Sequence, residues 1–367
     1  MKLLVVNTAP SRRNGITNVA FNLIKAIDKT DICIGYVSVS EIADEYKQIL
    51  NDLNINTYIL NRSITNPISY IKKLASIAKG YEVIHVHGNS ATMVLEMLAA
   101  KLAGVPLRCA HSHSTTCSMR VIDKMMRPLF NRLCNGRLAC GVEAGKWLHK
   151  DKDFLIINNG IETAKFKFNA ESRNKIRNRL GWNDNIIIAD IANFVEAKNH
   201  EFLIDVFYYI SKVNKNIRLL LLGAGPLMDK AIKQAESLGI SDQIVFAGSV
   251  PNIAEYLSAI DLIVMPSKFE GLPLTLVEEQ ANGLSAIVSD AVTRDANMTG
   301  HLIFLSLDKG LDSWAEEINN QLNNNIKRNE SYSLDSIEMI KKSGYDIKSS
   351  AIKLKNFYIS KLQKLHE

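Results

Sequence analysis

The sequence lacks any apolar run long enough to cross a membrane, since a spanning helix needs about 18 or more consecutive apolar residues. The apolar run near its start, Leu3–Val6, ends at Asn7 and is too short for the hydrophobic region of a signal peptide. With 47% hydrophobic and 22% charged residues, the composition excludes a disordered or collagen-like chain. We expect a soluble cytoplasmic protein and leave open an association with the cytoplasmic face of a membrane.

Cysteine is scarce, and its spacing excludes the usual cysteine frameworks. The five cysteines are Cys33, Cys109, Cys117, Cys134 and Cys140, and no two have Cys-x-x-Cys spacing. An odd number without that spacing favours reduced thiols over disulfides or a zinc knuckle. Asp151 and Asp153 form an Asp-x-Asp pair of the kind that holds a divalent metal, but they lie in a charged turn. We expect no bound metal.

The length and the charge distribution both suggest two different halves. At roughly 150 residues per domain, 367 residues predict two domains. Residues 1–165 carry 21 basic and 13 acidic side chains, a net charge of +8, whereas residues 166–367 carry 23 and 25, a net charge of −2. The first half is therefore expected to face something anionic.

Short runs rich in Val, Ile and Leu alternate with amphipathic stretches along the chain, as strands buried on both faces of a parallel sheet do. The strand candidates are Lys2–Val6, Ile32–Val37, Val83–Val86, Leu107–Ala110, Leu155–Ile157, Ile186–Ile191, Arg218–Leu222, Ile244–Ala247, Leu262–Met265 and Ser285–Ser289. We predict two doubly wound α/β domains, 1–165 and 166–344, which face each other across a cleft. A last amphipathic helix, 345–367, is expected to pack back onto the first domain.

The strongest local signal is SKFEGLPLTLVEEQANG, residues 267–283. A strand runs into a loop with Glu270, and a helix that contains Glu278 begins near Pro273. The backbone N–H groups around Leu272–Thr275 are the unpaired donors of a helix start, which suit a phosphate group. Glu278 is placed to accept from ribose hydroxyls and Glu270 from a sugar hydroxyl. The alternative is a pair of solvated surface carboxylates.

Two further loops follow predicted strands and supply groups that suit a diphosphate. Lys198 stands beyond the strand Ile186–Ile191, where an ammonium group can meet phosphate oxygens. Gly15 follows the first strand and lets a ligand approach the backbone, because it has no Cβ. Arg12 and Arg13 are additional cations on that loop.

A Gly-x-Gly turn, LLGAGPL, follows the strand Arg218–Leu222. The third glycine of the dinucleotide-binding pattern is absent, since Met228 stands at its position. The partial pattern argues against a dehydrogenase, and Gly223 and Gly225 are also explained by a tight turn between strand and helix.

Four of the eight histidines stand at strand ends in the first half, namely His85, His87, His111 and His113. His-x-His pairs occur in metal sites, but no nearby cysteine or carboxylate completes a familiar zinc set. We interpret the four as residues that line the cleft or act as an acid or base. Structural capping and zinc binding are the alternatives.

Residues 118–137 combine basic and apolar side chains. The basic ones are Arg120, Lys124, Arg127, Arg132 and Arg137, interleaved with Val, Ile, Met, Leu and Phe. Pro128 predicts a kink, or a split into two short helices. A basic amphipathic stretch can lie on an anionic membrane, and the alternative is a core-packing helix with a solvated basic face.

Together these segments resemble the retaining glycosyltransferases of the GT-B fold, glycosyl transferase group 1 (family four). The resemblance covers nearly the whole chain and is carried, in order, by a glycine-bearing first loop, KNHEFLIDVF, LLGAGPL, VFAGSV and FEGLPLTLVEEQANGL with its Glu–seven residues–Glu spacing. HVHGNSATM and AHSHS are most similar to the subgroup that builds exopolysaccharide and capsule repeat units. It implies an acceptor-side N-terminal domain and a nucleotide-sugar-binding C-terminal domain.

The resemblance also implies roles for single residues. Glu278 would bind the donor ribose, Glu270 the donor sugar and Lys198 the diphosphate, while the acid–base-like histidine is His111, with His113 as the alternative. The implied catalytic set is therefore His111, His113, Lys198 and Glu270. The implied donor-binding set is Gly15, Asn193, Lys198, Gly248, Val250, Glu270, Leu274, Thr275 and Glu278.

The implied reaction is transfer of a hexosyl group from a nucleotide sugar, UDP-linked, to a lipid-linked or saccharide acceptor, with retention. No cofactor beyond the donor and no nucleic acid is expected. One departure concerns Asn193, which stands where the family usually has an arginine, so that a bidentate cation on the diphosphate is missing. Two alternatives follow: a weak or inactive subunit that binds nucleotide sugar or a partner, and a UDP-sugar 2-epimerase.

Overall fold

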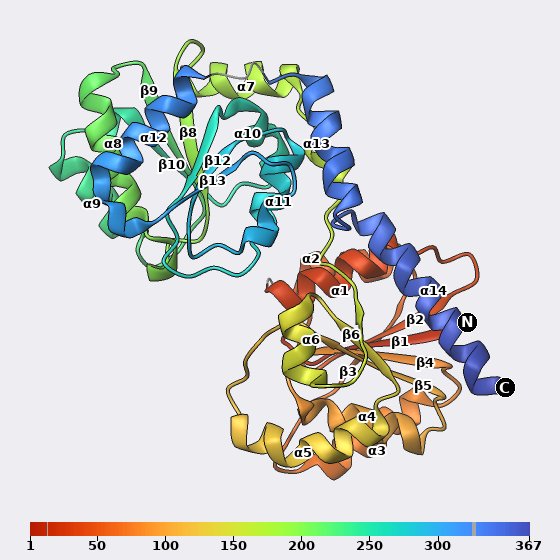
Figure 1. The fold of residues 1–367 in the computed structure, drawn as a ribbon. Coiled ribbons are helices and arrows are strands. Elements are labelled where there is room, and N and C mark those ends of the chain that lie inside the picture. The colour runs from red at the N-terminus through yellow and green to blue at the C-terminus, as the bar shows by residue number, and fades with distance from the viewer. Residues whose placement is uncertain (13, 325–327) are drawn as a thin grey trace. The chain divides into compact units, whose positions relative to one another are not determined.

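The computed structural model describes residues 1–12, 14–324 and 328–367. Arg13, one of the loop cations considered above, lies outside the described residues. The chain forms two compact units (Figure 1): unit 1 comprises Met1–Gly160 and Gly344–Glu367, and unit 2 comprises Ile161–Ser343. The expected division placed the first boundary at residue 165, and the structure divides the chain five residues earlier, after Gly160.

Unit 1 contains a seven-stranded parallel sheet in the order β3-β2-β1-β4-β5-β6-β7. Its strands are β1 (Lys2–Asn7), β2 (Cys33–Ser38), β3 (Asn56–Ile59), β4 (Val83–Gly88), β5 (Leu107–Ser112), β6 (Gly136–Ala139) and β7 (Leu155–Ile156). Its helices are α1 (Gly15–Ala26), α2 (Asp44–Asp52), α3 (Pro67–Ala78), α4 (Val94–Leu102), α5 (Arg120–Leu133), α6 (Val142–His149) and α14 (Ile347–His366).

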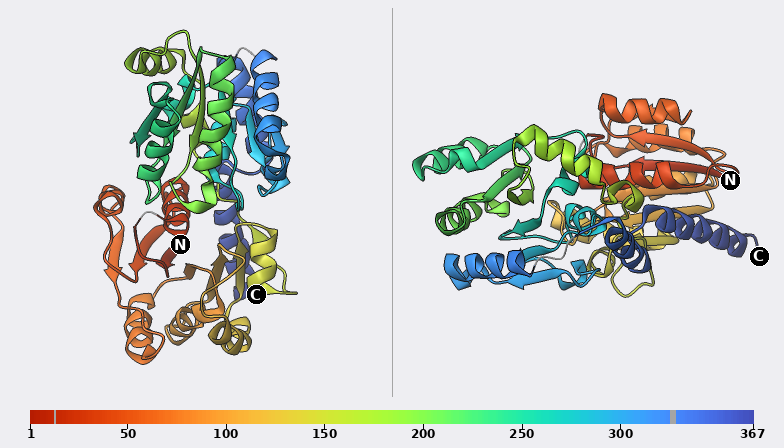
Figure 2. Two further views of the ribbon diagram at one scale, coloured as in Figure 1. Left: turned by 90° about the vertical axis from the view of Figure 1, so that its left-hand side faces the viewer. Right: turned by 90° about the horizontal axis from the view of Figure 1, so that it is seen from above.

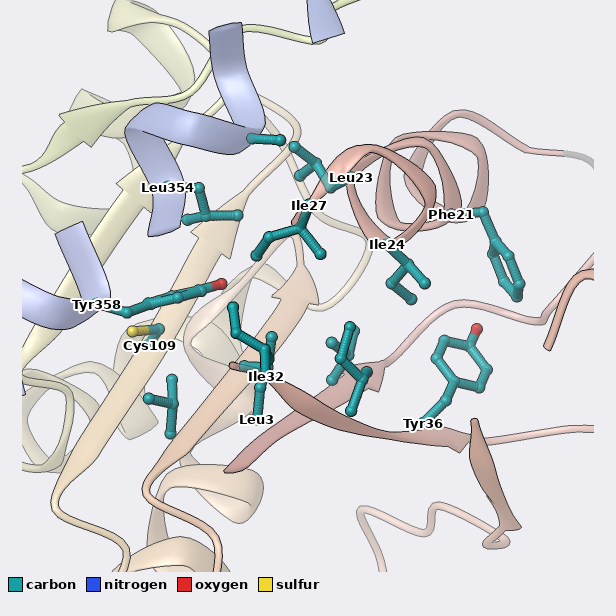
Figure 3. Close-up of a cluster of buried hydrophobic side chains, with 14 of the residues drawn as sticks. Leu3, Phe21, Leu23, Ile24, Ile27, Ile32, Tyr36, Cys109, Leu354 and Tyr358 are labelled. Atoms are coloured by element: carbon teal, nitrogen blue, oxygen red, sulfur yellow. The ribbon is translucent and has the colours of Figure 1, made fainter. Parts of the chain in front are cut away.

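Alternation along the strands sends side chains of unit 1 into two cores, because successive residues point to opposite faces of a sheet. Val83 of β4 packs in one core with α1, α2 and α14, whereas Ile84 packs in the other with α3, α4 and α5. Figure 3 shows the first core, where Leu354 and Tyr358 of α14 lie over the same sheet face as Ile24 of α1. The last helix is therefore part of the core of unit 1.

Unit 2 contains a six-stranded parallel sheet in the order β10-β9-β8-β11-β12-β13. Its strands are β8 (Ile186–Ile191), β9 (Ile217–Leu222), β10 (Ile244–Gly248), β11 (Leu262–Met265), β12 (Ala286–Ser289) and β13 (Leu302–Leu305). Its helices are α7 (Ala170–Leu180), α8 (His200–Val213), α9 (Met228–Ser237), α10 (Ile253–Ala259), α11 (Leu274–Ala281), α12 (Gly310–Asn323) and α13 (Glu330–Lys342). Figures 1 and 2 show helices on both sides of each sheet, which confirms the doubly wound α/β class.

Three strands, β3, β6 and β13, were not expected from the sequence. β3 and β13 are edge strands, and β6 lies next to the short edge strand β7. Runs of Val, Ile and Leu mark strands buried on both faces, and the edge strand β3 has no such run, whereas β13, LIFL, is an apolar run that was not assigned as a strand. In β3, NTYI, three of the four residues are exposed, and Ile59 is its single aliphatic residue.

Of the two outcomes expected at Pro128, a kink or a split, the split is wrong, since α5 continues through Pro128 as one helix of 14 residues. Tertiary contacts hold it on both sides of the proline. Phe130 is fully buried, and Arg127 pairs with Asp123 and donates to the carbonyl oxygens of Trp147 and Leu148. No helix in the described part of the chain is long and apolar enough to cross a membrane.

Candidate active site

In each unit the chain winds in opposite directions from one point of the sheet, between β1 and β4 in unit 1 and between β8 and β11 in unit 2. Ligands of doubly wound sheets bind at the carboxyl ends of the strands at such a point. Lys198 follows β8 and Glu270 follows β11, while Gly15 follows β1 and His113 follows β5. The residues singled out from the sequence thus gather at the functional edge of each sheet.

In unit 2, direct contacts join the loop after β8 to the loop after β11. The Lys268 backbone N–H donates to the Ala197 carbonyl oxygen at 2.8 Å, and Asn199 Nδ2 donates to the Pro266 carbonyl oxygen at 3.1 Å. Lys198 Nζ donates to Glu270 Oε2, and both side chains are less than a fifth exposed. The fold therefore places the ammonium and carboxylate groups, 72 residues apart in the chain, in contact.

The helix α11 begins beside Glu270 with free backbone donors. Pro273 is its N-cap rather than a first-turn residue, and no side chain caps the helix. The N–H groups of Leu274 and Thr275 thus point out of the helix start, where the helix dipole favours an anion. Further along, Glu278 is largely buried, and burial raises its pKa to about 7 despite the opposing charge of Lys165.

Two buried carboxyl groups near Lys198 were missed by sequence reasoning. Asp190 at the end of β8 and Glu279 on α11 are at most 1% exposed, and neither carboxyl group has a hydrogen-bond partner among the described residues. Burial raises the pKa of Asp190 to about 7 and that of Glu279 well above its usual value. Asp190 Oδ2 lies 3.4 Å from Nε2 of His200. An acidic residue inside the apolar run IIIADI was the available signal.

The Gly-x-Gly turn of unit 2 packs against the loop that carries Asn193. A Cβ on Gly223, where φ is 141°, would lie 2.0 Å from the Ala192 carbonyl oxygen, and one on Gly225 would lie 2.5 Å from that of Phe194. The two glycines therefore permit close backbone contact, and Asn193 itself is exposed.

The predicted base-binding segment lies beside this turn. The Gly223 N–H donates to the Gly248 carbonyl oxygen at 2.9 Å, at the carboxyl end of β10. Gly248 has a φ of 65° with open space around its missing Cβ, and Val250 is half-buried. The open space beside the backbone at Gly248 leaves room for the flat ring of a base.

In unit 1, the four histidines pack together on one face of β4 and β5. The register pairs His87 with His111, so that His85 and His87 lie beside His111 and His113. Nδ1 of His87 is 2.9 Å from Nε2 of His113, and Nε2 of His85 is 3.2 Å from Nδ1 of His111. Burial lowers the pKa of all four, to about 3 for His113. All four imidazoles are therefore neutral at pH 7.

The histidines His85, His87 and His111 are the described residues whose ligand atoms come close enough to suggest a metal ion, within 4.8 Å of one another. The rings of His85 and His87 are stacked at a centroid distance of 4.2 Å and lie 16° from parallel. One ion cannot lie in the plane of two stacked rings, so this arrangement does not direct both lone pairs at a common centre. Asp151 and Asp153 are exposed and belong to no such group.

The structure separates the two candidate acid–base histidines by depth. His111 is fully buried, whereas His113 lines an open pocket together with Gly15 and Arg12. Gly15 is the first residue of α1, and the preceding Asn14 caps that helix by accepting from the Thr17 N–H at 2.9 Å.

Comparison with known proteins shows which family the chain is similar to. The family described as glycosyl transferases group 1 matches residues 172–333. The chain is 30% identical over 324 residues to the glycosyltransferase EpsF of Bacillus subtilis (strain 168), which covers 83% of this chain and 84% of EpsF. It is 27% identical over 250 residues to UDP-Gal:alpha-D-GlcNAc-diphosphoundecaprenol alpha-1,3-galactosyltransferase of Escherichia coli, which covers 61% of this chain and 62% of that enzyme.

Among solved structures, Anabaena HepE in complex with UDP is similar, with a TM-score of 0.80 and 17% identity over 98% of this chain and 100% of that chain. This likeness confirms the GT-B fold. The identity to EpsF over most of both chains confirms the family that the motifs indicated. The chain belongs to the group 1 glycosyltransferases, enzymes that take the transferred sugar from a nucleotide-sugar donor.

Proposed function

We propose that the protein transfers a hexosyl group from a UDP-linked sugar to a lipid-linked or saccharide acceptor in exopolysaccharide or capsule synthesis, with retention. The contact between Lys198 and Glu270 beside the free start of α11 carries this proposal. The name of the Escherichia coli relative specifies a UDP-linked donor and a diphosphoundecaprenol-linked acceptor, and HepE was solved with UDP. Both support a UDP-sugar donor here.

In this mechanism the donor diphosphate lies against unit 2. Negative charge grows on the diphosphate as the glycosyl bond breaks, and fixed donors aimed at that charge lower the barrier. Lys198 and the N–H groups of Leu274 and Thr275 are such donors. Glu270 accepts from a hydroxyl of the donor sugar, and its contact with Lys198 holds both side chains in place.

The remaining donor contacts follow from burial and position. The Glu278 carboxyl group accepts from the ribose hydroxyls, while the backbone between Gly248 and Val250 faces the base. On the acceptor side we assign the acid–base role to His113, because His113 lines a pocket and His111 is fully buried.

A weakly active or inactive subunit is the second candidate, and Asn193 is the observation that favours it. The exposed Asn193 side chain carries no charge, so a second cation on the leaving diphosphate is absent from this position. Such a protein would still bind the nucleotide sugar.

We also propose that unit 1 contacts an anionic membrane through α5. Val121, Met125 and Leu129 are 74%, 76% and 47% exposed, and their spacing of four residues places them on one face of the helix. Arg120, Lys124 and Arg132 are exposed beside this apolar stripe. The acidic residue of α5, Asp123, is buried and paired with Arg127, so the exposed charges of the helix are positive. This combination is typical of helices that lie in a membrane interface.

Calorimetry and product analysis test the donor assignment. Glu278→Ala should weaken binding of a UDP-sugar by about 1.5–3 kcal/mol, the range for hydrogen bonds to charged groups. Glu270→Ala should lower turnover more than it lowers affinity. Unchanged affinity in Glu278→Ala would reject the role of that residue. Binding of the UDP-sugar without turnover in the presence of acceptor extract would favour the second candidate, whereas release of UDP without transfer would indicate hydrolysis.

A further inference from the structure

The loop that carries Lys198 is closed at its base by two buried side chains. Asp190 is the penultimate residue of β8, and His200 is the first residue of α8. Oδ2 of Asp190 lies 3.4 Å from Nε2 of His200. The two side chains therefore meet across the ends of the loop, residues 192–199, which contains both Asn193 and Lys198.

The imidazole ring of His200 is held in a fixed plane. It is stacked on the ring of Phe194 at a centroid distance of 4.0 Å and lies 11° from parallel. Phe194 is fully buried, and its backbone N–H and carbonyl oxygen are both bonded at 3.1 Å, to the Ala224 carbonyl oxygen and the Leu227 N–H. The turn after β9 thus fixes Phe194, and the stacked imidazole keeps its Nε2 beside Asp190.

The two groups at this contact have unsatisfied polar atoms. Asp190 and His200 are 1% and 5% exposed, and both carboxyl oxygens and Nε2 lack a hydrogen-bond partner among the described residues. Buried polar groups in native proteins are almost always satisfied, and leaving one unpaired is costly. A shift of about 0.3 Å would bring the two groups from 3.4 Å into hydrogen-bond range. Each group can therefore satisfy the other.

Burial favours the neutral form of both groups, because a charged form is poorly solvated in the core. It raises the pKa of Asp190 to about 7, against the opposing effects of the Lys198 charge and the Ile191 N–H, and it lowers the pKa of His200 to about 4. A protonated carboxyl group can donate to the lone pair of a neutral imidazole. A neutral pair leaves the positive charge of Lys198 to an anionic ligand, whereas an ionised carboxylate behind Lys198 would repel phosphate.

The contact adds a third support to the Lys198 loop. The hydrogen bonds of Ala197 and Asn199 join this loop to the loop after β11. The contact between Asp190 and His200 joins it to β8, the strand from which it begins. We propose that Asp190 and His200 are positioning residues, whose hydrogen bond holds the Lys198 ammonium group at the donor diphosphate. This inference rests on the proposed function, which assigns the diphosphate to Lys198.

Calorimetry of UDP binding to full-length variants tests the coupling between the two residues. His200→Phe keeps a stacked ring but removes both ring nitrogens, and Asp190→Ala removes the carboxyl group. Each should weaken UDP binding about threefold to tenfold, as the loss of a hydrogen bond does. The double variant should bind no more weakly than the weaker single variant, because its second substitution finds the contact already broken. Losses that add in the double variant would overturn the inference.

A Lys198→Ala background separates positioning from a general structural role. If the pair acts through Lys198, His200→Phe should change UDP affinity by less than about twofold in this background. An equal loss of affinity with and without Lys198 would contradict the positioning role.

Asp190→Asn is the conservative variant, since its amide N–H can donate to Nε2 of a neutral imidazole. It should bind UDP within about twofold of wild type, whereas a loss as large as that of Asp190→Ala would exclude the hydrogen bond. Circular dichroism checks that each variant is folded. If His200→Phe does not fold, Asp190→Ala and Asp190→Asn, each with and without Lys198, supply the same comparison.

Glu279→Gln is the matched control for a buried carboxyl group. Glu279 is fully buried and makes no hydrogen bond within the described part of the chain, but it lies on α11 rather than at an end of the Lys198 loop. Its effect on UDP affinity should add to that of His200→Phe, because the two do not share a contact. Coupling as strong as that between Asp190 and His200 would contradict a specific contact.

The same measurements separate this inference from the proposed function. If Lys198→Ala weakens UDP binding while His200→Phe and Asp190→Ala leave it unchanged, the inference fails and the proposed function stands. If the wild-type protein does not bind UDP, both fail.

Discussion

At the scale of single residues, burial rather than ion pairing sets the pKa of Glu278. The pKa of Glu278 rises to about 7 because desolvation disfavours its charged form more than Lys165 favours it. A hydroxyl that donates to this carboxylate stabilises the charged form, so ligand binding and proton release are coupled.

The affinity for UDP-sugar is therefore expected to rise as pH increases from 6 through 7 and to level off above the pKa of the free protein. Below pH 7 the free protein holds the proton that binding expels, and this opposes binding. Calorimetry over this range, in buffers with different ionisation enthalpies, measures both affinity and proton release. Glu278→Gln, which cannot ionise, should remove the pH dependence, and a slope that persists in Glu278→Gln would assign the effect to another group.

Asn193 and Lys198 provide a second prediction at this scale. With one cation missing, Lys198→Ala should abolish detectable transfer, since one fixed donor supplies about 2.7–4 kcal/mol to such a step. Asn193→Arg should raise turnover, because the Asn193 side chain is exposed and a longer one meets no steric barrier. Steady-state rates decide, with the exposed Lys233→Ala as the matched control. If Asn193→Arg is neutral and Arg12→Ala is damaging, Arg12 covers the diphosphate instead.

At the scale of secondary-structure elements, α5 and the turn after β9 are each held by a few specific packing contacts. In α5, buried contacts at Phe130 and Asp123 hold the helix and leave its apolar stripe exposed. In the turn, the two glycines allow backbone to meet backbone.

For α5, the double variant Val121→Ser and Met125→Ser should reduce binding to vesicles that contain anionic lipid by about tenfold or more. Each apolar side chain contributes about 1.5–3 kcal/mol when fully buried, and partial insertion retains a share of that. Co-sedimentation with vesicles at low and high salt measures the binding, which salt should weaken. Val213→Ser, at an 85% exposed apolar position of unit 2, is the control. Equal binding of wild type and double variant would contradict the membrane proposal.

For the turn, Gly225→Ala should lower the free energy of unfolding by about 1–3 kcal/mol, because the new methyl group meets the Phe194 carbonyl oxygen at 2.5 Å and the loop must shift. Gly271→Ala, with no atom within 4 Å of its Cβ position, should stay within about 0.5 kcal/mol of wild type. Urea unfolding followed by circular dichroism compares the two. A neutral Gly225→Ala would show that the close approach is not required.

At the scale of the whole molecule, burial shifts the pKa values of different groups in the two units. Unit 1 buries the neutral histidines His85, His87 and His111, whose pKa values burial lowers. Unit 2 buries Asp190, Glu278 and Glu279, whose pKa values burial raises. Acidification therefore acts in opposite directions on the two units.

Between pH 7 and pH 5 we expect unit 1 to lose stability and unit 2 to gain it. Unfolded histidines take up protons below about pH 6.5 while the buried ones stay neutral, so a lower pH favours unfolding of unit 1. In unit 2, carboxyl groups of the unfolded chain stay ionised down to about pH 4.5, whereas the buried carboxyl groups bind protons near pH 7. A lower pH therefore favours folded unit 2. The pKa of His200 is lowered to about 4, which gives a smaller opposing effect. Hydrogen exchange of peptides from β4 and β8, corrected for intrinsic rates, measures the two trends. Parallel trends would contradict the prediction.

The sequence alone determined the central strands, the doubly wound class and the family. Each depends on local patterns: apolar runs such as IIIADI mark buried strands, and the spacing from Glu270 to Glu278 places both residues around one helix start. The contact between Lys198 and Glu270 could be anticipated only as a shared sheet edge, because the carboxyl ends of adjacent parallel strands always meet there. The roles of these residues stay proposals.

Tertiary structure distinguished residues that look equivalent in the local sequence pattern. His111 and His113 lie two residues apart on the same strand face, and only their depth in unit 1 separates the buried ring from the one that lines the pocket. Asn89 and Asn159 are 70 positions apart in the sequence, and they line one pocket because α14 returns to unit 1 and holds the segment before Gly160. Periodicity reports which face of an element is buried, whereas burial depth and long-range contacts exist only once the whole chain has packed.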